Sequence, residues 1–265
     1  MNAMTAFFKK ELREAIATHK LTVLGLVFLL FGIMNPLMAK LLPDILGSVL
    51  PDGMTVTLPA PSAIDSWAQF YKNIPQMGLI VLVLLYGGMM ASELSRGTLT
   101  HLLTKGLSLG GVILAKYAAA ALVWTAAYAL CLGVTWVYTL YFWPTDNLPN
   151  LPLAALGLWV FGLVLLAPLP LGGVLFKSNY GSLLFTGALV VLLTLLNIVP
   201  AIATISPLTL ASTSMALIGG MLPASAFLWP MVTALGLIAV FLGIGVLVFD
   251  RRSLAAFDFR LKLAG

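Results

Sequence analysis

The sequence predicts an all-α membrane protein with six transmembrane helices. Hydrophobic residues make up 61% of the 265 residues and charged residues only 9%, and the mean hydropathy is +1.06. A soluble domain carries roughly 25% charged residues, so this chain has too few polar side chains to cover a surface that faces water. The apolar residues also form blocks of about 20 residues, the length at which a helix crosses a bilayer with its backbone hydrogen bonds satisfied.

An amphipathic helix is expected before the first apolar block. At about 100° per residue, positions 6–20 place apolar side chains on one face and basic side chains around the other. Such a helix lies in the membrane interface, with its basic face against anionic headgroups. The alternative is a solvated helix with no further role. The residues assigned to this interfacial helix are Phe8, Lys9, Lys10, Leu12, Arg13 and Ile16.

The six spans follow from the apolar blocks and belong to a single transmembrane domain, residues 1–265. Pro168 and Pro170 are expected to kink or break the fourth span. No charged residue occurs from 178 to 249. Because this stretch is too long for one crossing, its prolines and glycines must divide it into a fifth span, a broken segment and a sixth span. The predicted spans are about 21–39, 76–92, 117–143, 153–176, 180–202 and 227–249.

Two further segments allow two interpretations each. The outer loop, residues 40–75, forms either a small extracellular cap or a flexible connector. The end of the chain alternates apolar and charged residues over 257–263, which is typical of a strand, although a frayed tail fits the pattern equally well.

The distribution of basic residues predicts the orientation. The net charge is +5, and twelve of the fourteen Lys and Arg residues fall in the connections of one side, whereas only Lys40 and Lys72 fall on the other. Since basic loops stay in the cytoplasm, we expect a multi-pass protein of the plasma membrane with both termini cytoplasmic. A cleaved signal peptide is not expected, because the first apolar run is longer than a typical signal-peptide core.

The spans carry no set of residues typical of a catalytic or metal site. They contain no pair of carboxylates, no His/Cys cluster and no Ser/His/Asp set, and the single cysteine, Cys131, is typical of a small buried apolar residue. Residues 172–178 end in Lys-Ser like a phosphate-binding loop, but Phe176 replaces the required glycine. We therefore expect no cofactor, no metal, no nucleic acid and no catalysis in this chain. The lack of charge within the spans also disfavours an ion-coupled carrier.

The most distinctive segment is the loop after the second span, residues 93–116. Leucines at helical spacing between Gly97 and Gly106 predict a short amphipathic helix on the cytoplasmic surface. The loop resembles that of permease subunits of the type-2 ABC transporter family, and the matching residues are Glu93, Gly97, Thr98, Leu102, Leu103, Thr104, Ser108 and Lys116. It departs from that family at Gly106, where proline is frequent, and at Leu109, where arginine is frequent.

The resemblance implies the permease subunit of an ATP-driven exporter of bacterial origin. Its partners would be cytoplasmic ABC ATPase subunits, which bind ATP and Mg, a second permease subunit, with a homodimer favoured, and the lipid bilayer. The cargo would be an amphipathic or lipid-like drug or peptide, and residues 215–222 would form part of a re-entrant segment. The residues that would couple to the ATPase are Glu93, Arg96, Gly97, Thr98, Leu99, Leu102, Leu103, Lys105 and Gly106.

Two other classes of function stay open at this point. One is a non-transporting membrane anchor or regulatory scaffold that recruits a cytoplasmic partner through its inner helices. The other is a lipid-modifying membrane enzyme, which is disfavoured because no acid, base or nucleophile cluster lies within the spans.

Overall fold

The computed structural model describes residues 3–49, 60–96, 108–146 and 148–264, and all regular elements in this part of the chain are helices. Six helical stretches are long and apolar enough to cross a membrane, as the sequence predicts. The helices are α1 Ala3–Ala17, α2 Lys20–Val49, α3 Ala63–Asn73, η1 Ile74–Gly78, α4 Leu79–Tyr86, α5 Ala91–Arg96, α7 Leu109–Phe142, α8 Leu151–Leu166, α9 Pro168–Phe176, α10 Asn179–Leu196, α11 Pro200–Ala203, α12 Thr209–Ser212, α13 Ser214–Ile218, η2 Ala224–Phe227 and α14 Leu228–Ala264.

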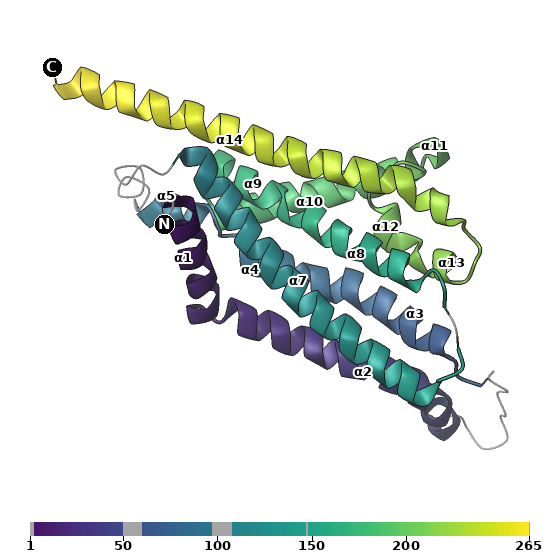
Figure 1. Ribbon diagram of the computed structural model, residues 1–265. Helices are drawn as coiled ribbons and strands as arrows, with labels where there is room; N and C mark the ends of the chain where they lie inside the picture. The colour runs from purple at the N-terminus through teal and green to yellow at the C-terminus, as the bar shows by residue number, and fades with distance from the viewer. Residues whose placement is uncertain (1–2, 50–59, 97–107, 147, 265) are drawn as a thin grey trace.

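The long helices run side by side as one bundle (Figure 1). Helix α7 packs along α2 on one side and contacts α8 and α14 on the other. The start of α1 and the end of α14 lie at the same end of the bundle, near α5, whereas α3 begins at the opposite end (Figure 1). We call these the α5 end and the far end of the bundle.

Buried aromatic rings hold α2, α3 and α7 together. The Trp124 ring meets the Phe28 ring edge-on at 5.5 Å and lies 5.0 Å from the Tyr128 ring, which in turn contacts Phe70 at 5.9 Å. Such offset and edge-to-face pairs are favourable beyond the apolar area that they bury. Where α8 crosses this cluster it carries Gly162, because a Cβ at that position would lie 2.4 Å from the Trp124 indole.

The fourth span breaks where its prolines predict. Helix α8 ends at Leu166 and α9 begins at Pro168, with Ala167 as a turn between them. A proline inside a helix removes one backbone donor and clashes with the preceding turn. The Ser182 hydroxyl of α10 donates a hydrogen bond of 2.8 Å to the Leu169 carbonyl of α9, so a polar contact between neighbouring helices follows directly after the break.

The broken segment between the fifth and sixth spans is also confirmed. Helices α12 and α13 fold back against α8 at the far end of the bundle, and their leucines Leu210 and Leu217 are fully buried. The Asn150 amide at the start of α8 donates to the Leu217 carbonyl at 2.9 Å. The helix found near the predicted re-entrant residues 215–222 is α13, which ends at Ile218.

Three helices differ in extent from the predicted spans. The helical stretch that contains the predicted second span begins at Ala63, before Gln76, and α2 continues through Pro43 to Val49. Much of the predicted outer loop 40–75 is therefore helical. The start of α3 is capped by Asp65, whose carboxylate accepts from the Ser62 N–H at 2.9 Å. The Asp146 carboxylate also accepts from the Ala63 N–H at 2.9 Å. Helix α10, which contains most of the predicted fifth span, ends at Leu196, before the predicted limit at residue 202.

The connection 93–116 and the C-terminal tail also differ from prediction. Its two ends are helical, since α5 runs to Arg96 and α7 begins at Leu109. The short helix predicted between Gly97 and Gly106 lies outside the residues that the structure describes. The tail at 257–263 is neither a strand nor a frayed end but continues α14. An alternating pattern specifies a strand only where a neighbouring strand pairs with it, and the described chain contains none.

Candidate functional site

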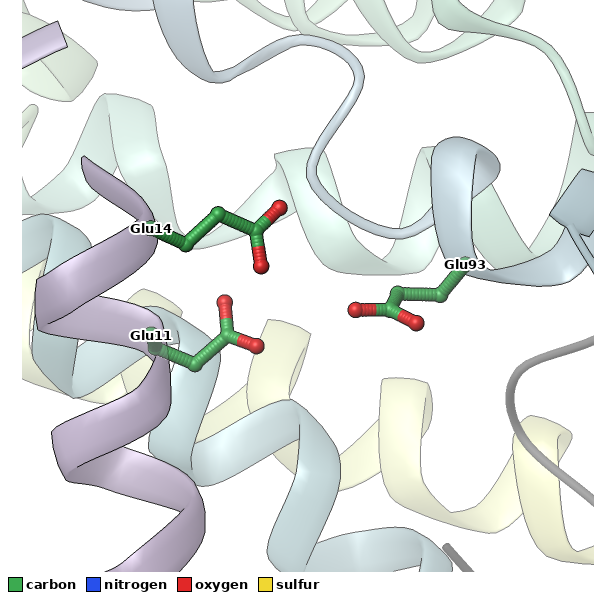
Figure 2. A group of neighbouring side chains, drawn as sticks. All are labelled: Glu11, Glu14 and Glu93. Atoms are coloured by element: carbon green, nitrogen blue, oxygen red, sulfur yellow. The ribbon is translucent and has the colours of Figure 1, made fainter. Parts of the chain in front are cut away.

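A cluster of charged side chains lies at the α5 end of the bundle, where α1, α5 and α7 meet. Helix α1 contributes Glu11 and Glu14, α5 contributes Glu93, and the three carboxylates point toward one another (Figure 2). Helix α7 contributes Lys116, and α1 adds Lys10. We call these five residues the ion-pair cluster.

Lys116 is the buried centre of the cluster. Its side chain is only 3% exposed, and its Nζ lies 2.8 Å from Glu11 Oε2 and 3.1 Å from Glu93 Oε1. Taking such charges out of water costs several kcal/mol for each ion, and only close and well-bonded partners offset that cost. Lys116 therefore ties α7 to both α1 and α5.

Lys10 links the same helices from the more exposed side. Its Nζ donates to Glu93 Oε1 at 2.8 Å and lies 3.0 Å from Glu11 Oε1 and 2.9 Å from Glu14 Oε2. Glu93 thus accepts from two ammonium groups that belong to different helices, α1 and α7. A single carboxylate on α5 holds both neighbours.

The electrostatics of α1 follow from these contacts. Burial by itself would lower the pKa of Lys10, but the hydrogen bonds to Glu93 and Glu14 and the charge of Glu11 raise it above its usual range. For Glu14, burial works to raise the pKa, but the hydrogen bond and the charge of Lys10 outweigh it and lower the pKa. Both side chains therefore stay charged around neutral pH.

The three carboxylates are close enough together to hold a metal ion, with one oxygen from each within 4.8 Å of the others. The two ammonium groups of Lys10 and Lys116 already supply the positive charge that such an ion would bring. We therefore interpret the arrangement as an ion-pair network that joins helices, and we derive no metal chemistry from it.

A tight turn positions α1 for these contacts. Helix α1 ends at Ala17, and His19 adopts the left-handed conformation, φ 58°, before α2 begins at Lys20. This turn lays α1 against α7, where Phe7 and Ala15 are buried. The Phe7 ring lies 5.2 Å from the Lys10 ammonium and 5.7 Å from that of Lys116, so it also covers the cluster.

The predicted interfacial-helix residues divide into two groups. Phe8 and Leu12 are half-buried, whereas Lys9, Arg13 and Ile16 are exposed. Lys10 is different, because its ammonium group faces three carboxylates rather than the headgroups for which the sequence favoured it.

The predicted ATPase-coupling residues are only partly described. Glu93 is placed inside the bundle with 7% of its side chain exposed, and Arg96 ends α5. Glu93 therefore contacts this chain's own helices. The remaining predicted coupling residues lie outside the described part of the chain, and they are Gly97, Thr98, Leu99, Leu102, Leu103, Lys105 and Gly106.

Sequence reasoning missed the roles of Glu11, Glu14 and Lys116. It counted Lys116 as a topology signal just before the third span, but α7 begins at Leu109 and places that lysine two turns inside a helix that is otherwise uncharged. A charge in such a position needs a partner. A lone lysine inside an apolar helix thus predicts a carboxylate partner, and the glutamates of the amphipathic N-terminal helix are candidates for it.

Comparison with known proteins supports the membrane assignment at a coarse level. No family model matches the chain. The chain is 22% identical over 181 residues to the uncharacterized transmembrane protein YxlG of Bacillus subtilis (strain 168), an alignment that covers 67% of this chain and 70% of that protein. The chain is thus a membrane protein with several transmembrane helices and a distant relative of the same kind.

Proposed function

We propose that this chain is the permease subunit of an ATP-driven ABC exporter in the plasma membrane. Its two ends face the cytoplasm, where separate ATPase subunits bind ATP and Mg, and a second permease subunit, most simply another copy, completes the assembly. The chain itself is not catalytic. The cargo is an amphipathic or lipid-like molecule, a drug or a peptide.

The observation that carries this proposal is the position of Glu93. It lies on α5, which ends at Arg96 and leads directly into residues 97–107, the segment proposed to contact the ATPase. The Glu93 carboxylate is bonded to Lys10 of α1 and Lys116 of α7. A force applied to the cytoplasmic segment therefore reaches three helices through one side chain.

The burial of the ion-pair cluster supports the proposal that it transmits force from the cytoplasmic segment to the three helices. Breaking a buried ion pair leaves an uncompensated charge and costs about 3–5 kcal/mol, so the three helices should move together rather than separate. Helix α1 is continuous in sequence with the first span and α5 with the second, and α7 is the third span itself. Half of the membrane domain can respond to one cytoplasmic contact.

The leucines of the segment 97–107 supply the test. In a helix-in-groove contact, a few buried apolar anchors carry most of the binding energy, about 2 kcal/mol or more for a central one. The double variant Leu102→Ser and Leu103→Ser should therefore lose the ATPase when the tagged chain is purified from its native membrane. Substituting Ile16→Ser, exposed on α1, is the matched control for loss of apolar surface.

The outcome separates transport from the scaffold alternative. An ATPase that co-purifies with the wild type and the control but not with the double variant supports the proposal. Wild-type yield of the ATPase with the double variant, at normal expression of the chain, would show that these leucines are not the coupling contact.

A further inference from the structure

A large groove in the membrane-spanning part lies away from the ion-pair cluster. Its volume is about 700 Å³, within the range of roughly 300–1,000 Å³ typical of small-molecule sites. The second span forms one wall through α3, η1 and α4, and α8, α10, α12 and α13 form the others. Its apolar lining includes Ile80, Val83, Leu84, Leu165, Leu183 and Val190.

Polar side chains line this groove toward the far end of the bundle. Lys72 and Gln76 lie about one turn apart on the wall formed by α3 and η1, and Ser212 of α12 also lines the groove. All three residues are exposed, and none of their side chains has an ion-pair or hydrogen-bond partner among the residues that the structure describes.

The backbone departs from a regular helix at this place. Ile74–Gly78 forms a π-helical turn that contains Pro75, between the regular helices α3 and α4. Such turns occur mostly as single insertions in α-helices and often at functional sites, because the extra residue redirects the neighbouring side chains. Here the turn carries Gln76, which lines the groove.

The position of Lys72 along its span sets its depth in the membrane. Glu93 belongs to the charged cluster at the α5 end, and Lys72 lies on the same helical span. At about 1.5 Å per residue the two are about 30 Å apart, which is about the thickness of the hydrocarbon core. Lys72 therefore reaches the headgroup level at the far end, and the groove extends from there into the hydrocarbon.

We propose that this groove binds a single-chain anionic amphiphile, with the anionic group at Lys72 and Gln76 and the apolar tail between α4, α8 and α10. Lys72 has no carboxylate partner in the described part of the chain, so its ammonium group can form a charge-assisted hydrogen bond with a bound anion. Gln76 adds amide donors, and the apolar wall takes the tail.

The volume favours one chain over two. A site of this size encloses one drug-sized molecule, whereas a diacyl phospholipid would leave its second chain outside the walls. If the chain is the exporter proposed above, this amphiphile is its cargo, and that identification rests on the proposed function. Binding itself needs neither ATP nor a partner.

The charge arm of the test uses a fluorescent fatty acid, 11-(dansylamino)undecanoate, and the full-length chain in neutral detergent. Lys72→Gln should weaken binding roughly tenfold, the loss expected for a charge-assisted hydrogen bond. Lys40→Gln, which removes another exposed lysine outside the groove, should leave binding unchanged. Unlabelled dodecanoate should displace the probe, and dodecanol should displace it at least tenfold less well.

The shape arm fills the groove without touching its polar groups. Gly187 of α10 lines the groove, and a Cβ there would meet no atom within 4 Å. Gly187→Leu should therefore fold normally and reduce probe binding at least tenfold. Gly133→Leu is the matched control, because Gly133 also has open space around it but lies on α7 outside the groove.

Two results would overturn the inference. One is unchanged binding in Lys72→Gln and Gly187→Leu, which would mean that the probe binds elsewhere. The other is displacement of the probe by phosphatidylglycerol vesicles as efficiently as by dodecanoate, which would identify the occupant as a bilayer phospholipid. Failure of the exporter proposal is a separate outcome, since it would leave probe binding intact while no ATPase co-purifies.

Discussion

The Nζ atom of Lys116 lies 2.8 Å from Oε2 of Glu11, although the two residues are 105 positions apart in the sequence. Lys116 is on α7 and Glu11 is on the amphipathic N-terminal helix α1. This contact holds α1 against the bundle at a point where apolar packing is supplied by few side chains, chiefly Phe7 and Ala15. The N-terminal helix is thus part of the packed domain.

Removing the buried ammonium group should destabilise the protein. Lys116→Met keeps most of the side-chain volume but leaves Glu11 and Glu93 to Lys10 alone, so the free energy of unfolding should fall by about 3 kcal/mol. Chemical unfolding in detergent, followed by tryptophan fluorescence, measures this. Lys40→Met, at an exposed position, is the control, and a loss in Lys116→Met no larger than in this control would contradict the account of the cluster.

Gly162 should tolerate no larger residue. A Cβ at this position would lie 2.4 Å from the Trp124 ring, which is fully buried and donates to the Trp159 carbonyl at 3.0 Å. Gly162→Ala should therefore lower the free energy of unfolding by about 1–3 kcal/mol, as overpacking does. Gly133→Ala has open space and should be neutral or stabilising by up to about 1 kcal/mol. Equal stability of the two variants would count against the packing of α8 on α7.

The pair formed by Lys10 and Glu14 should give a defined pH dependence. Because the folded pKa of Glu14 is lowered, its contribution is present above the usual glutamate pKa of about 4.3 and is lost as the pH falls through the lowered value. The raised pKa of Lys10 makes its contribution present below about pH 10.4 and lost as the pH rises through the raised value.

The measurement for this pair is the stability difference between the wild type and Glu14→Gln. It should be constant from about pH 6 to about pH 9 and shrink toward zero below about pH 4, with a plateau of about 1 kcal/mol or less because both side chains are partly exposed. A stability difference between the wild type and Glu14→Gln that grows as the pH falls would contradict the assigned contact between Lys10 and Glu14.

Cysteine labelling in intact cells tests the orientation. With Cys131 replaced by Ser, Thr145→Cys and Ser225→Cys should react with a membrane-impermeant maleimide, since both residues are exposed at the far end. Ser108→Cys, exposed next to the segment 97–107, should react only after the cells are opened. Labelling of the Ser108 position in intact cells would reverse the assignment of the two sides.

Apolar blocks and helix breakers predict much of this fold, because they act locally. The break at Pro168 and the interruption between the fifth and sixth spans follow from proline and glycine placement, whereas the short helices there are implied by the family resemblance. The ends of the helices are less predictable where a helix continues beyond its apolar block into polar sequence. The start of α3 has a local capping box, Ser62 with Asp65, which sequence reasoning missed, and a second cap from the distant Asp146. The patterned tail is helical because it continues α14.

The candidate sites depend on distant contacts, and sequence patterns reveal them less well. The loop pattern predicts a coupling role for Glu93, but its carboxylate is bonded to Lys10 and Lys116 from two other helices. The groove similarly combines Lys72 of the second span with Gly187 of the fifth. No spacing within one segment specifies which helices become neighbours.

The most direct test of the central claim is whether this chain works with an ATPase. We expect the wild-type chain, purified from its native membrane in mild detergent, to carry an ATP-hydrolysing partner in comparable amount. That activity should change by at least twofold in Glu93→Gln, which removes the charge that joins α5 to α1 and α7. A wild-type chain that purifies without any ATPase, or an ATPase whose activity is the same with Glu93→Gln as with the wild type, would contradict the account.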